Sequence, residues 1–310
     1  MANIKVRELA TGLRFPEGPI AMPDGSVILV EIARQTLSRV TPAGKVEVVA
    51  NLGGGPNGAA MGPDNCVYIT NNGGFTWQEA EGHLFTDGTA SADYKSGSIQ
   101  RVNLSTGKVE TLYTECDGVP LYGPNDLVFD NHGGFYFTDL GKVFGRNLAL
   151  GGLYYAKADG SSIRQLAFPI QLANGCGLSP DGKTIYVAQT YTGWLVKWTV
   201  TAPGEIAPSA SGIPGDLVGA ADGRNLFDSL AVEADGRVCV ATIGSAPSGG
   251  ISVIEPNGNL EFLPFEDPAV TNICFGGKDM KSAWLTLSGH GRLIMAEWPR
   301  PGLKLVHQEI

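Results

Sequence analysis

The sequence predicts an all-β fold built from six copies of one pattern, and three observations carry this prediction. An acid or amide side chain lies seven residues before a turn residue, and an apolar strand follows each turn. The pattern recurs along the chain at intervals typical of blades with insertions. With 43 Gly, 19 Pro and a charged fraction of 17%, the composition suits short strands joined by tight turns. The sequence therefore predicts a six-bladed β-propeller with four-stranded antiparallel blades.

The six copies share an anchoring residue, a turn residue and the strand that follows. They read FPEGPIAMPDGSVILV, GPNGAAMGPDNCVYIT, GPNDLVFDNHGGFYFT, ANGCGLSPDGKTIYVA, LFDSLAVEADGRVCVA and VTNICFGGKDMKSAWLT. The anchors are Glu17, Asn57, Asn125, Asn174, Asp228 and Asn272. The turn residues are Asp24, Asp64, His132, Asp181, Asp235 and Asp279. Because equivalent positions of a closed radial array lie on a ring, we expect the six anchors to converge on the central tunnel.

The first copy shows how one blade is built. An inner strand is expected over about residues 17 to 22, followed by a turn at Asp24-Gly25 and by the strands SVILVEI, TLSRVTP and KVEVVANL. The longest insertion runs from residue 73 to 97 in the second blade. Long loops of this kind are usually functional or disordered. Its Trp77 is expected to close over an apolar substrate, with packing of the loop onto the rim as the alternative.

The whole chain, residues 1–310, is predicted to form a single propeller domain. An N-terminal strand over about residues 3 to 10 aligns with the last strand of a blade, so we expect it to complete blade six. Closing the ring in this way avoids unpaired strand edges, which invite aggregation. The C-terminal segment LKLVHQEI competes for the same outer position.

Charge and composition exclude several classes of partner. The net charge is −9 and the 22 basic residues are scattered, which disfavours nucleic acid and anionic membranes. The sequence has neither a readable signal peptide nor an apolar run of about 20 residues, so a cytoplasmic protein is predicted, as a monomer or small homo-oligomer. Five cysteines without CxxC spacing read as reduced thiols.

Four of the anchors predict a metal site. Carboxylate and amide oxygens from Glu17, Asn125, Asn174 and Asp228 are hard ligands that suit one divalent cation. Calcium is favoured, with magnesium, manganese or zinc as alternatives. The anchors could instead have a structural role, because Asn and Asp before a strand often form side-chain-to-backbone turns. Against it, all six anchors keep the same register, one of them is a Glu, and their flanking residues differ.

Four segments carry a family resemblance: FPEGP, GPNDLVFD, ANGCGLSPDGKTIYVAQT and LFDSLAVEADG. They resemble the signature segments of the senescence marker protein/gluconolactonase/luciferin-regenerating enzyme family. Its members are six-bladed propellers with a divalent cation in the tunnel, among them gluconolactonases, other sugar lactonases, regucalcin and a diisopropyl-fluorophosphatase. The resemblance implies that Glu17, Asn125, Asn174 and Asp228 hold the cation. One departure is Gly123, which stands where sugar lactonases place an Arg that contacts sugar hydroxyls.

The predicted activity is metal-dependent opening of a lactone, either a sugar lactone or a less polar one. Asp228 and Glu17 are the expected catalytic residues, with either Asp228 or a metal-bound water as the base. The substrate is expected to contact a further set of residues around the ring: Asn57, Asn272, Tyr122, His290 and Trp77. Two alternatives stay open, a phosphotriesterase of the diisopropyl-fluorophosphatase type and a non-catalytic calcium-binding propeller. The sequence lacks the GxSxG elbow of a serine hydrolase and the phosphate-binding GxxxxGK[ST] loop.

Overall fold

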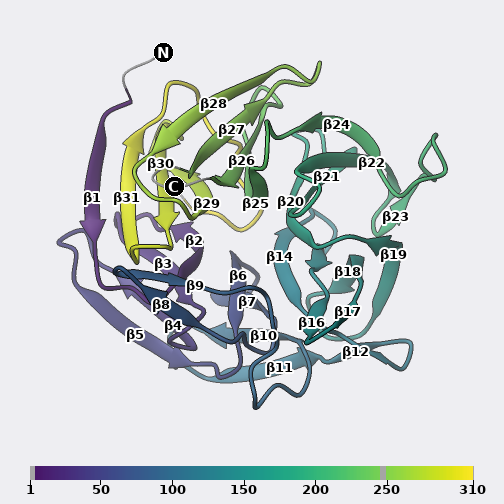
Figure 1. Cartoon of the computed structure of the whole chain (residues 1–310), viewed down its shortest axis with the longest axis horizontal. Helices are drawn as coiled ribbons and strands as arrows, with labels where there is room; N and C mark the ends of the chain where they lie inside the picture. Colours follow the sequence, from purple (N-terminus) through teal and green to yellow (C-terminus); the bar gives the residue numbers. More distant parts are fainter. Residues whose placement is uncertain (1–3, 245–248, 310) are drawn as a thin grey trace.

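The structure is a computed structural model that describes residues 4–244 and 249–309. Six antiparallel sheets are arranged around a central axis, as Figure 1 shows. The described residues form strands, turns and loops without a helix. The predicted six-bladed β-propeller is therefore confirmed. The part of the chain that the structure describes also contains no helix with the length and apolarity that a membrane crossing needs.

The first three blades follow one another along the chain, each from its inner to its outer strand. Blade one consists of β2 (Pro16–Ala21), β3 (Val27–Glu31), β4 (Thr36–Val40) and β5 (Val46–Asn51). Blade two consists of β6 (Pro56–Met61), β7 (Cys66–Asn71), β10 (Ser98–Asn103) and β11 (Val109–Tyr113). Blade three consists of β14 (Pro124–Phe129), β15 (Gly134–Asp139), β18 (Gly151–Lys157) and β19 (Ile163–Ile170).

The last three blades complete the circle. Blade four consists of β20 (Ala173–Leu178), β21 (Thr184–Gln189), β22 (Trp194–Ala202) and β24 (Asp216–Ala220), and β22 also pairs with the short β23 (Glu205–Ile206). Blade five consists of β25 (Leu226–Val232), β26 (Val238–Ile243), β27 (Gly249–Ile254) and β28 (Leu260–Phe265). Blade six consists of β29 (Val270–Gly276), β30 (Ser282–Leu287), β31 (Arg292–Glu297) and β1 (Val6–Ala10).

The N-terminal strand lies at the outer edge of blade six. β1 pairs antiparallel with β31, with Val6 opposite Ala296. The N-terminal segment, rather than the C-terminal one, therefore occupies the outer position. Residue 3 of the strand expected over about residues 3 to 10, and residue 310 of the competing segment, lie outside the described residues.

Six clusters of buried apolar side chains hold the described blades together. Each cluster lies between two neighbouring blades, including blades six and one. The inner strands contact one another around the tunnel. The core is thus a ring of packed interfaces, and its centre is free to form a tunnel.

The turns between the first two strands use the Asp residues of the repeat. Asp24, Asp181, Asp235 and Asp279 each accept a hydrogen bond of 3.0 to 3.2 Å from the backbone N–H two residues later. In blade three, Asp130 takes this role, because its Oδ1 accepts hydrogen bonds from the His132 and Gly134 N–H groups at 2.8 and 3.0 Å. A side-chain cap of this kind stabilises the turn.

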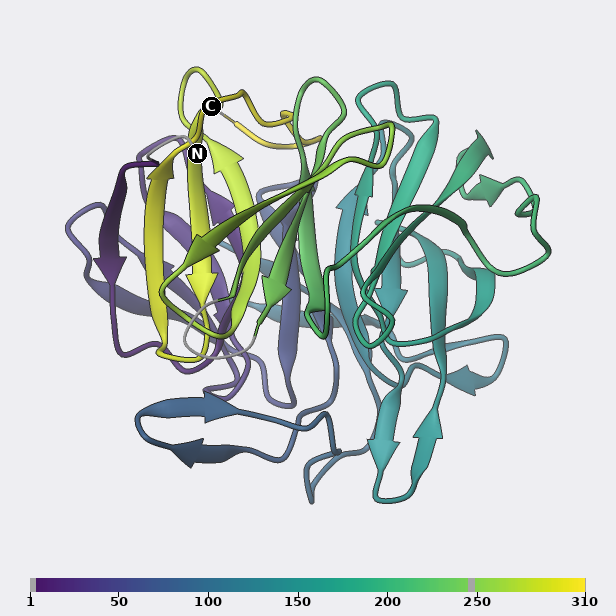
Figure 2. The same ribbon diagram turned by 45° about the horizontal axis from the view of Figure 1, so that its top comes forward.

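Different segments lie over the two faces of the propeller. In Figure 2, the hairpin of β8 (Gln78–Ala80) and β9 (His83–Phe85) and that of β16 (Lys142–Phe144) and β17 (Asn147–Ala149) project from one face. The C-terminal segment, drawn in yellow, crosses the opposite face. A third small hairpin joins β12 (Glu115–Cys116) and β13 (Val119–Pro120), and β12 contacts β19 of blade three.

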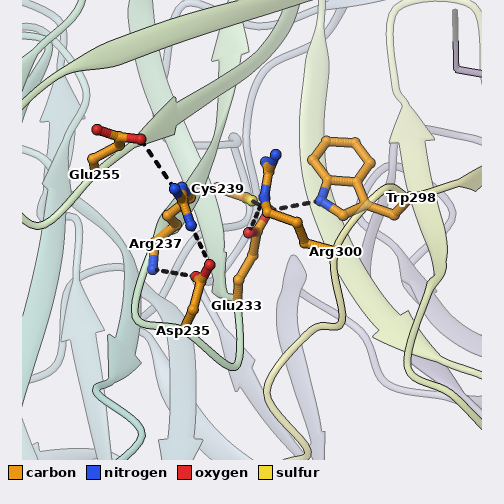
Figure 3. Close-up of polar contacts among 7 residues, drawn as sticks. All are labelled: Glu233, Asp235, Arg237, Cys239, Glu255, Trp298 and Arg300. Carbon is orange, nitrogen blue, oxygen red and sulfur yellow. Dashed lines mark hydrogen bonds and ion pairs between the residues drawn. The ribbon is translucent and has the colours of Figure 1, made fainter. Parts of the chain in front are cut away.

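A cluster around Glu233 fixes the C-terminal segment to blade five (Figure 3). Trp298 Nε1 donates to Glu233 Oε1 at 2.7 Å, and Arg300 donates from Nε and Nη2 to the two carboxylate oxygens. Beyond the cluster, Leu303 and Leu305 line the end of the tunnel. The C-terminal segment therefore closes this end and leaves the opposite end as the open one.

Candidate functional site at the open end of the tunnel

Each of the six anchors lies at the second or third residue of an inner strand, where the pairing with the next strand is irregular. The anchors in strand order are Glu17 in β2, Asn57 in β6, Asn125 in β14, Asn174 in β20, Asp228 in β25 and Asn272 in β29. In every case the register shifts at or beside the anchor. A bulge redirects the side chain at its position. Six bulges at equivalent positions therefore turn all six anchors toward the tunnel.

Glycines beside three anchors let the inner strands come close together. A Cβ atom on Gly58 would lie 2.5 Å from the Asn125 carbonyl oxygen, and a Cβ atom on Gly18 would lie 2.5 Å from the Ala59 nitrogen. Gly175 is similarly close to the Leu230 nitrogen, at 2.6 Å. Only glycine permits this approach, so these residues set the narrow width of the ring.

Five of the six anchors line a cavity of about 160 Å³ beneath the insertion. They are Glu17, Asn57, Asn125, Asn174 and Asp228. Asn272 lines the tunnel below it and donates from Nδ2 to Glu17 Oε2 at 2.7 Å. The apolar wall of the cavity comes from several blades: Phe15, Ile32, Phe75, Leu140, Val143, Leu172, Leu226 and Ile243.

The two amides of the predicted metal site have buried oxygens without a partner. Neither Asn125 Oδ1 nor Asn174 Oδ1 accepts a hydrogen bond from any group that the structure describes. Asn174 Nδ2, in contrast, donates to Thr190 Oγ1 at 3.0 Å, which orients the amide. Buried polar atoms are almost always satisfied, so two orphaned oxygens facing one cavity indicate an electropositive ligand.

The carboxylates of the site are buried, and among the described residues no Lys or Arg forms an ion pair with them. Burial raises the pKa of Glu17 well above its ordinary value, and the charge of Asp228 acts in the same direction, against hydrogen bonds from Asn272 and the Gly18 N–H. Burial likewise raises the pKa of Asp228 to about 7. It also raises the pKa of Asp126, the residue after Asn125, to about 7. Burying ionised carboxylates is costly unless a positive charge accompanies them.

The four oxygens fit a hard divalent cation better than a soft one. Glu17 and Asp228 supply two negative charges, and Asn125 and Asn174 supply two amide oxygens that have no partner among the described groups. No cluster of three or more His, Cys, Asp or Glu side chains suited to a metal exists within the described residues. A mixed set of carboxylates and amides is, however, the kind that calcium accepts.

Besides Asn272, three predicted substrate contacts lie outside the residues that line the cavity. Trp77 packs behind the wall, with its ring centroid 4.9 Å from Phe15 and 6.2 Å from Phe75. Tyr122 is half-buried beside Phe144, with ring centroids 6.4 Å apart. Contact of Trp77 and Tyr122 with substrate stays a prediction.

His290, the third of them, lies at the rim of blade six. Its Nδ1 is 2.8 Å from Asp267 Oδ2, and its ring centroid is 4.0 Å from that of His83 in the insertion. The imidazole therefore connects the insertion to blade six. Its contact with substrate also stays a prediction.

Sequence reasoning did not single out Asp126 and Lys142. Asp126 directly follows an anchor, and this adjacency is the signal that could have marked it. Lys142 belongs to no motif, and only the fold brings its side chain into the wall of the cavity.

The fold and the site together define a β-propeller with an oxygen-lined ligand site at one end of its tunnel. The family model described as SMP-30/Gluconolactonase/LRE-like region matches residues 15–289. The chain therefore belongs to this family, and the resemblance of the four sequence segments is confirmed.

Relatives agree with this assignment. Lactonase drp35 of Staphylococcus epidermidis is 28% identical over 225 residues, which cover 71% of this chain and 61% of that protein. The match thus spans less than two thirds of the relative's length. A gluconolactonase from Xanthomonas campestris has a similar structure, with a TM-score of 0.75 and 19% identity over 96% of this chain and 91% of that one. The calcium-binding protein regucalcin from Agrobacterium tumefaciens gives a TM-score of 0.70 and 18% identity, with 97% and 98% covered. At these identities the structural matches show a shared fold.

Proposed function

We propose that this protein is a divalent-metal-dependent lactonase that acts at the open end of its tunnel. The observation that carries the proposal is the set of four buried oxygen-bearing side chains, in which two carboxylates lack a cation and two amide oxygens lack a partner among the described groups. Membership of a family that includes lactonases supports a lactone as the substrate. The calcium-binding relative supports calcium as the cation.

The cation would be held by Glu17, Asn125, Asn174 and Asp228. When bound, a divalent cation polarises the carbonyl of a lactone and stabilises the negative charge that develops on its oxygen. Asp228 takes the proton of the attacking water, since it is one of the two anchor carboxylates that line the cavity where the lactone would bind. Glu17, the second carboxylate, is held in place by Asn272 and the Gly18 N–H. Asn57 orients the substrate from the cavity wall.

The substrate is proposed to be less polar than a sugar lactone. Eight Phe, Ile, Leu and Val side chains line the cavity beside polar ones, and these eight offer no hydrogen bonds to hydroxyl groups. At position 123, a Cβ atom would lie 2.3 Å from the Gly141 carbonyl oxygen, so an Arg does not fit there without movement of the backbone. Both features favour a lactone with an apolar ring.

The proposal includes a location in the cytoplasm. All five cysteines are free thiols, as expected in a reducing compartment. Fractionation of cells that express the full chain, followed by detection with an antibody, tests this part.

The test is hydrolysis of a panel by metal-stripped protein with calcium, magnesium, manganese or zinc restored. The panel contains gluconolactone, xylonolactone, dihydrocoumarin, δ-valerolactone and diisopropyl fluorophosphate. We expect turnover of the apolar lactones with restored metal, and a loss of about 1,000-fold in Asp228→Ala, within the range for a general base. Asp235→Ala is the matched control, since Asp235 lies in the turn at the other end of the same blade.

Other outcomes point to the alternatives. Turnover of the fluorophosphate alone would make the protein a phosphotriesterase. A rise in melting temperature with calcium, without turnover of any compound, would leave a calcium-binding propeller.

A further inference from the structure

Lys142 is a buried lysine in the wall of the proposed active site. It is the first residue of β16, and only 1% of its surface is exposed. It lines the same cavity as Glu17 and Asp228. Among the described residues that line this cavity, Lys142 has the only basic side chain.

The partners of the ammonium group are neutral. Nζ donates to the Gly74 carbonyl oxygen at 3.2 Å and to Asn72 Oδ1 at 3.4 Å, and it lies 3.9 Å from the centroid of the Phe75 ring. The carboxylate whose charge acts on it, Asp139, accepts hydrogen bonds from three backbone N–H groups, those of Tyr122, Gly123 and Gly141.

This environment makes Lys142 a readily deprotonated lysine. Burial lowers its pKa to about 7, although the charge of Asp139 acts in the opposite direction. A buried cation among neutral partners is costly for stability. Such groups cluster at functional sites, where a pKa close to the working pH allows proton transfer.

Opening of a lactone requires a proton donor as well as a base. Water attacks the acyl carbon, and the bond between that carbon and the ring oxygen then breaks. The departing oxygen of an aliphatic lactone would otherwise leave as an alkoxide, which is a poor leaving group. We propose that Lys142 is the general acid of this reaction and donates its Nζ proton to the ring oxygen as that bond breaks.

The proton transfers of this reaction balance, and the role of Lys142 rests on the proposed function. Asp228 gains one proton from water and Lys142 loses one to the ring oxygen, so the product is a hydroxycarboxylic acid. Return of the proton from Asp228 to solvent, and uptake of one by Lys142, restore the enzyme. One proton is released in each turnover, because the product acid ionises at neutral pH.

Lys142 also connects blade three to the insertion through Gly74 and Phe75, so the test must separate catalysis from packing. Dihydrocoumarin and δ-valerolactone are both six-membered lactones, but the first releases a phenolate and the second an alkoxide. A phenolate, whose conjugate acid has a pKa of about 10, leaves without prior protonation. Loss of a general acid therefore affects δ-valerolactone far more than dihydrocoumarin, whereas misplacement of the insertion affects both alike.

The experiment measures kcat/KM for both lactones in the metal-restored wild type and in Lys142→Met, Lys142→Arg and Lys157→Met. For Lys142→Met we expect a fall of about 100-fold or more with δ-valerolactone, and of less than about fivefold with dihydrocoumarin. Lys142→Arg keeps the positive charge but holds its proton too tightly to donate it, so it should show the same selective loss even if the Met variant folds poorly. Lys157 is the matched control. It also binds a backbone carbonyl, that of His132 at 3.0 Å, and lies over an aromatic ring, that of Tyr155 at 5.6 Å, but away from the cavity.

Equal losses with both lactones, or full activity of Lys142→Arg with δ-valerolactone, would overturn the acid role and leave the proposed function intact. Absence of lactone turnover in the wild type would overturn both. The pH profile provides a second readout: with δ-valerolactone the wild-type kcat/KM should fall as Lys142 loses its proton above about pH 7, and this decline should disappear in Lys142→Met.

Discussion

Glu17 and Glu233 are both buried glutamates, with 2% and 0% of their surface exposed, but their surroundings differ. Glu233 receives hydrogen bonds from Arg300 and from Trp298 Nε1, so a guanidinium balances its charge. Figure 3 shows this cluster, which fixes the segment that covers the closed end of the tunnel. Glu17, at the open end, is hydrogen-bonded to an amide and a backbone N–H, and the charges that act on it are those of Asp228 and Asp126.

The difference in hydrogen-bond partners distinguishes a carboxylate with a structural role from one that is available to bind a ligand. A complete set of partners within the chain makes the Glu233 cluster a link between the C-terminal segment and blade five. The incomplete set around Glu17, next to two amide oxygens without a described partner, indicates that a cation supplies the remaining interactions. Loss of the carboxylate at the two positions should therefore have opposite effects on stability.

The largest expected effect on stability is at the closed end of the tunnel. Glu233→Ala leaves the partly buried Arg300 and the Trp298 N–H without their acceptor, so we expect the free energy of unfolding to fall by about 3 kcal/mol. Urea denaturation measures this change. The kcat of the remaining folded protein should equal that of wild type. Glu255→Ala, which removes a half-buried partner of Arg237 in the same blade, is the control and should leave the denaturation midpoint unchanged. An unchanged midpoint in Glu233→Ala would contradict the structural role.

The matched change at the open end should stabilise the metal-free protein. Glu17→Gln removes a buried charge beside Asp228, and we expect a gain of about 1–2 kcal/mol in the free energy of unfolding at pH 8, with a smaller gain at pH 5. It should also abolish the rise in melting temperature that calcium causes in wild type. Thermal melts with a chelator and with calcium measure both effects. If the metal-free Glu17→Gln protein is less stable than the wild type, Glu17 has a structural role like that of Glu233.

The metal-free wild type should lose stability as pH rises from about 4 to 7. The pKa values of Asp228 and Asp126 are about 7 in the folded protein, above their ordinary values, so the folded state holds more protons than the unfolded state in this range. Stability then falls by about 1.4 kcal/mol per pH unit for each excess proton. Lys142, whose pKa is lowered to about 7, acts in the opposite direction only above that pH.

Urea denaturation with a chelator at several pH values measures this slope. Calcium binds the ionised carboxylates, so its stabilising effect should increase over the same pH range. The variant Asp228→Asn should show a shallower slope. A free energy of unfolding that stays constant or rises between pH 5 and 7 would contradict the raised pKa values of the carboxyl groups at the open end.

The sequence repeat was sufficient to predict six blades and the positions of the six anchors, because the turn and the strand after it recur with fixed spacing. It did not predict the bulges that aim the anchors, since a bulge depends on how two strands pair. Lys142 was not predicted either, because its place in the cavity depends on how β16 packs against the insertion. For the same reason the predicted contacts of Trp77, Tyr122 and His290 with substrate remain open.

The smallest predicted effect concerns Trp77, which packs behind two cavity-lining rings, Phe15 and Phe75. Trp77→Ala removes this support, and an aromatic pair contributes about 0.5–1.5 kcal/mol, so we expect KM for an apolar lactone to rise roughly 2- to 12-fold with kcat nearly unchanged. Trp298→Phe, at the closed end, is the matched control. It removes the hydrogen bond to Glu233 and should lower the melting temperature without changing KM. A fall in kcat with unchanged KM in Trp77→Ala would show that the insertion serves the chemical step rather than substrate binding.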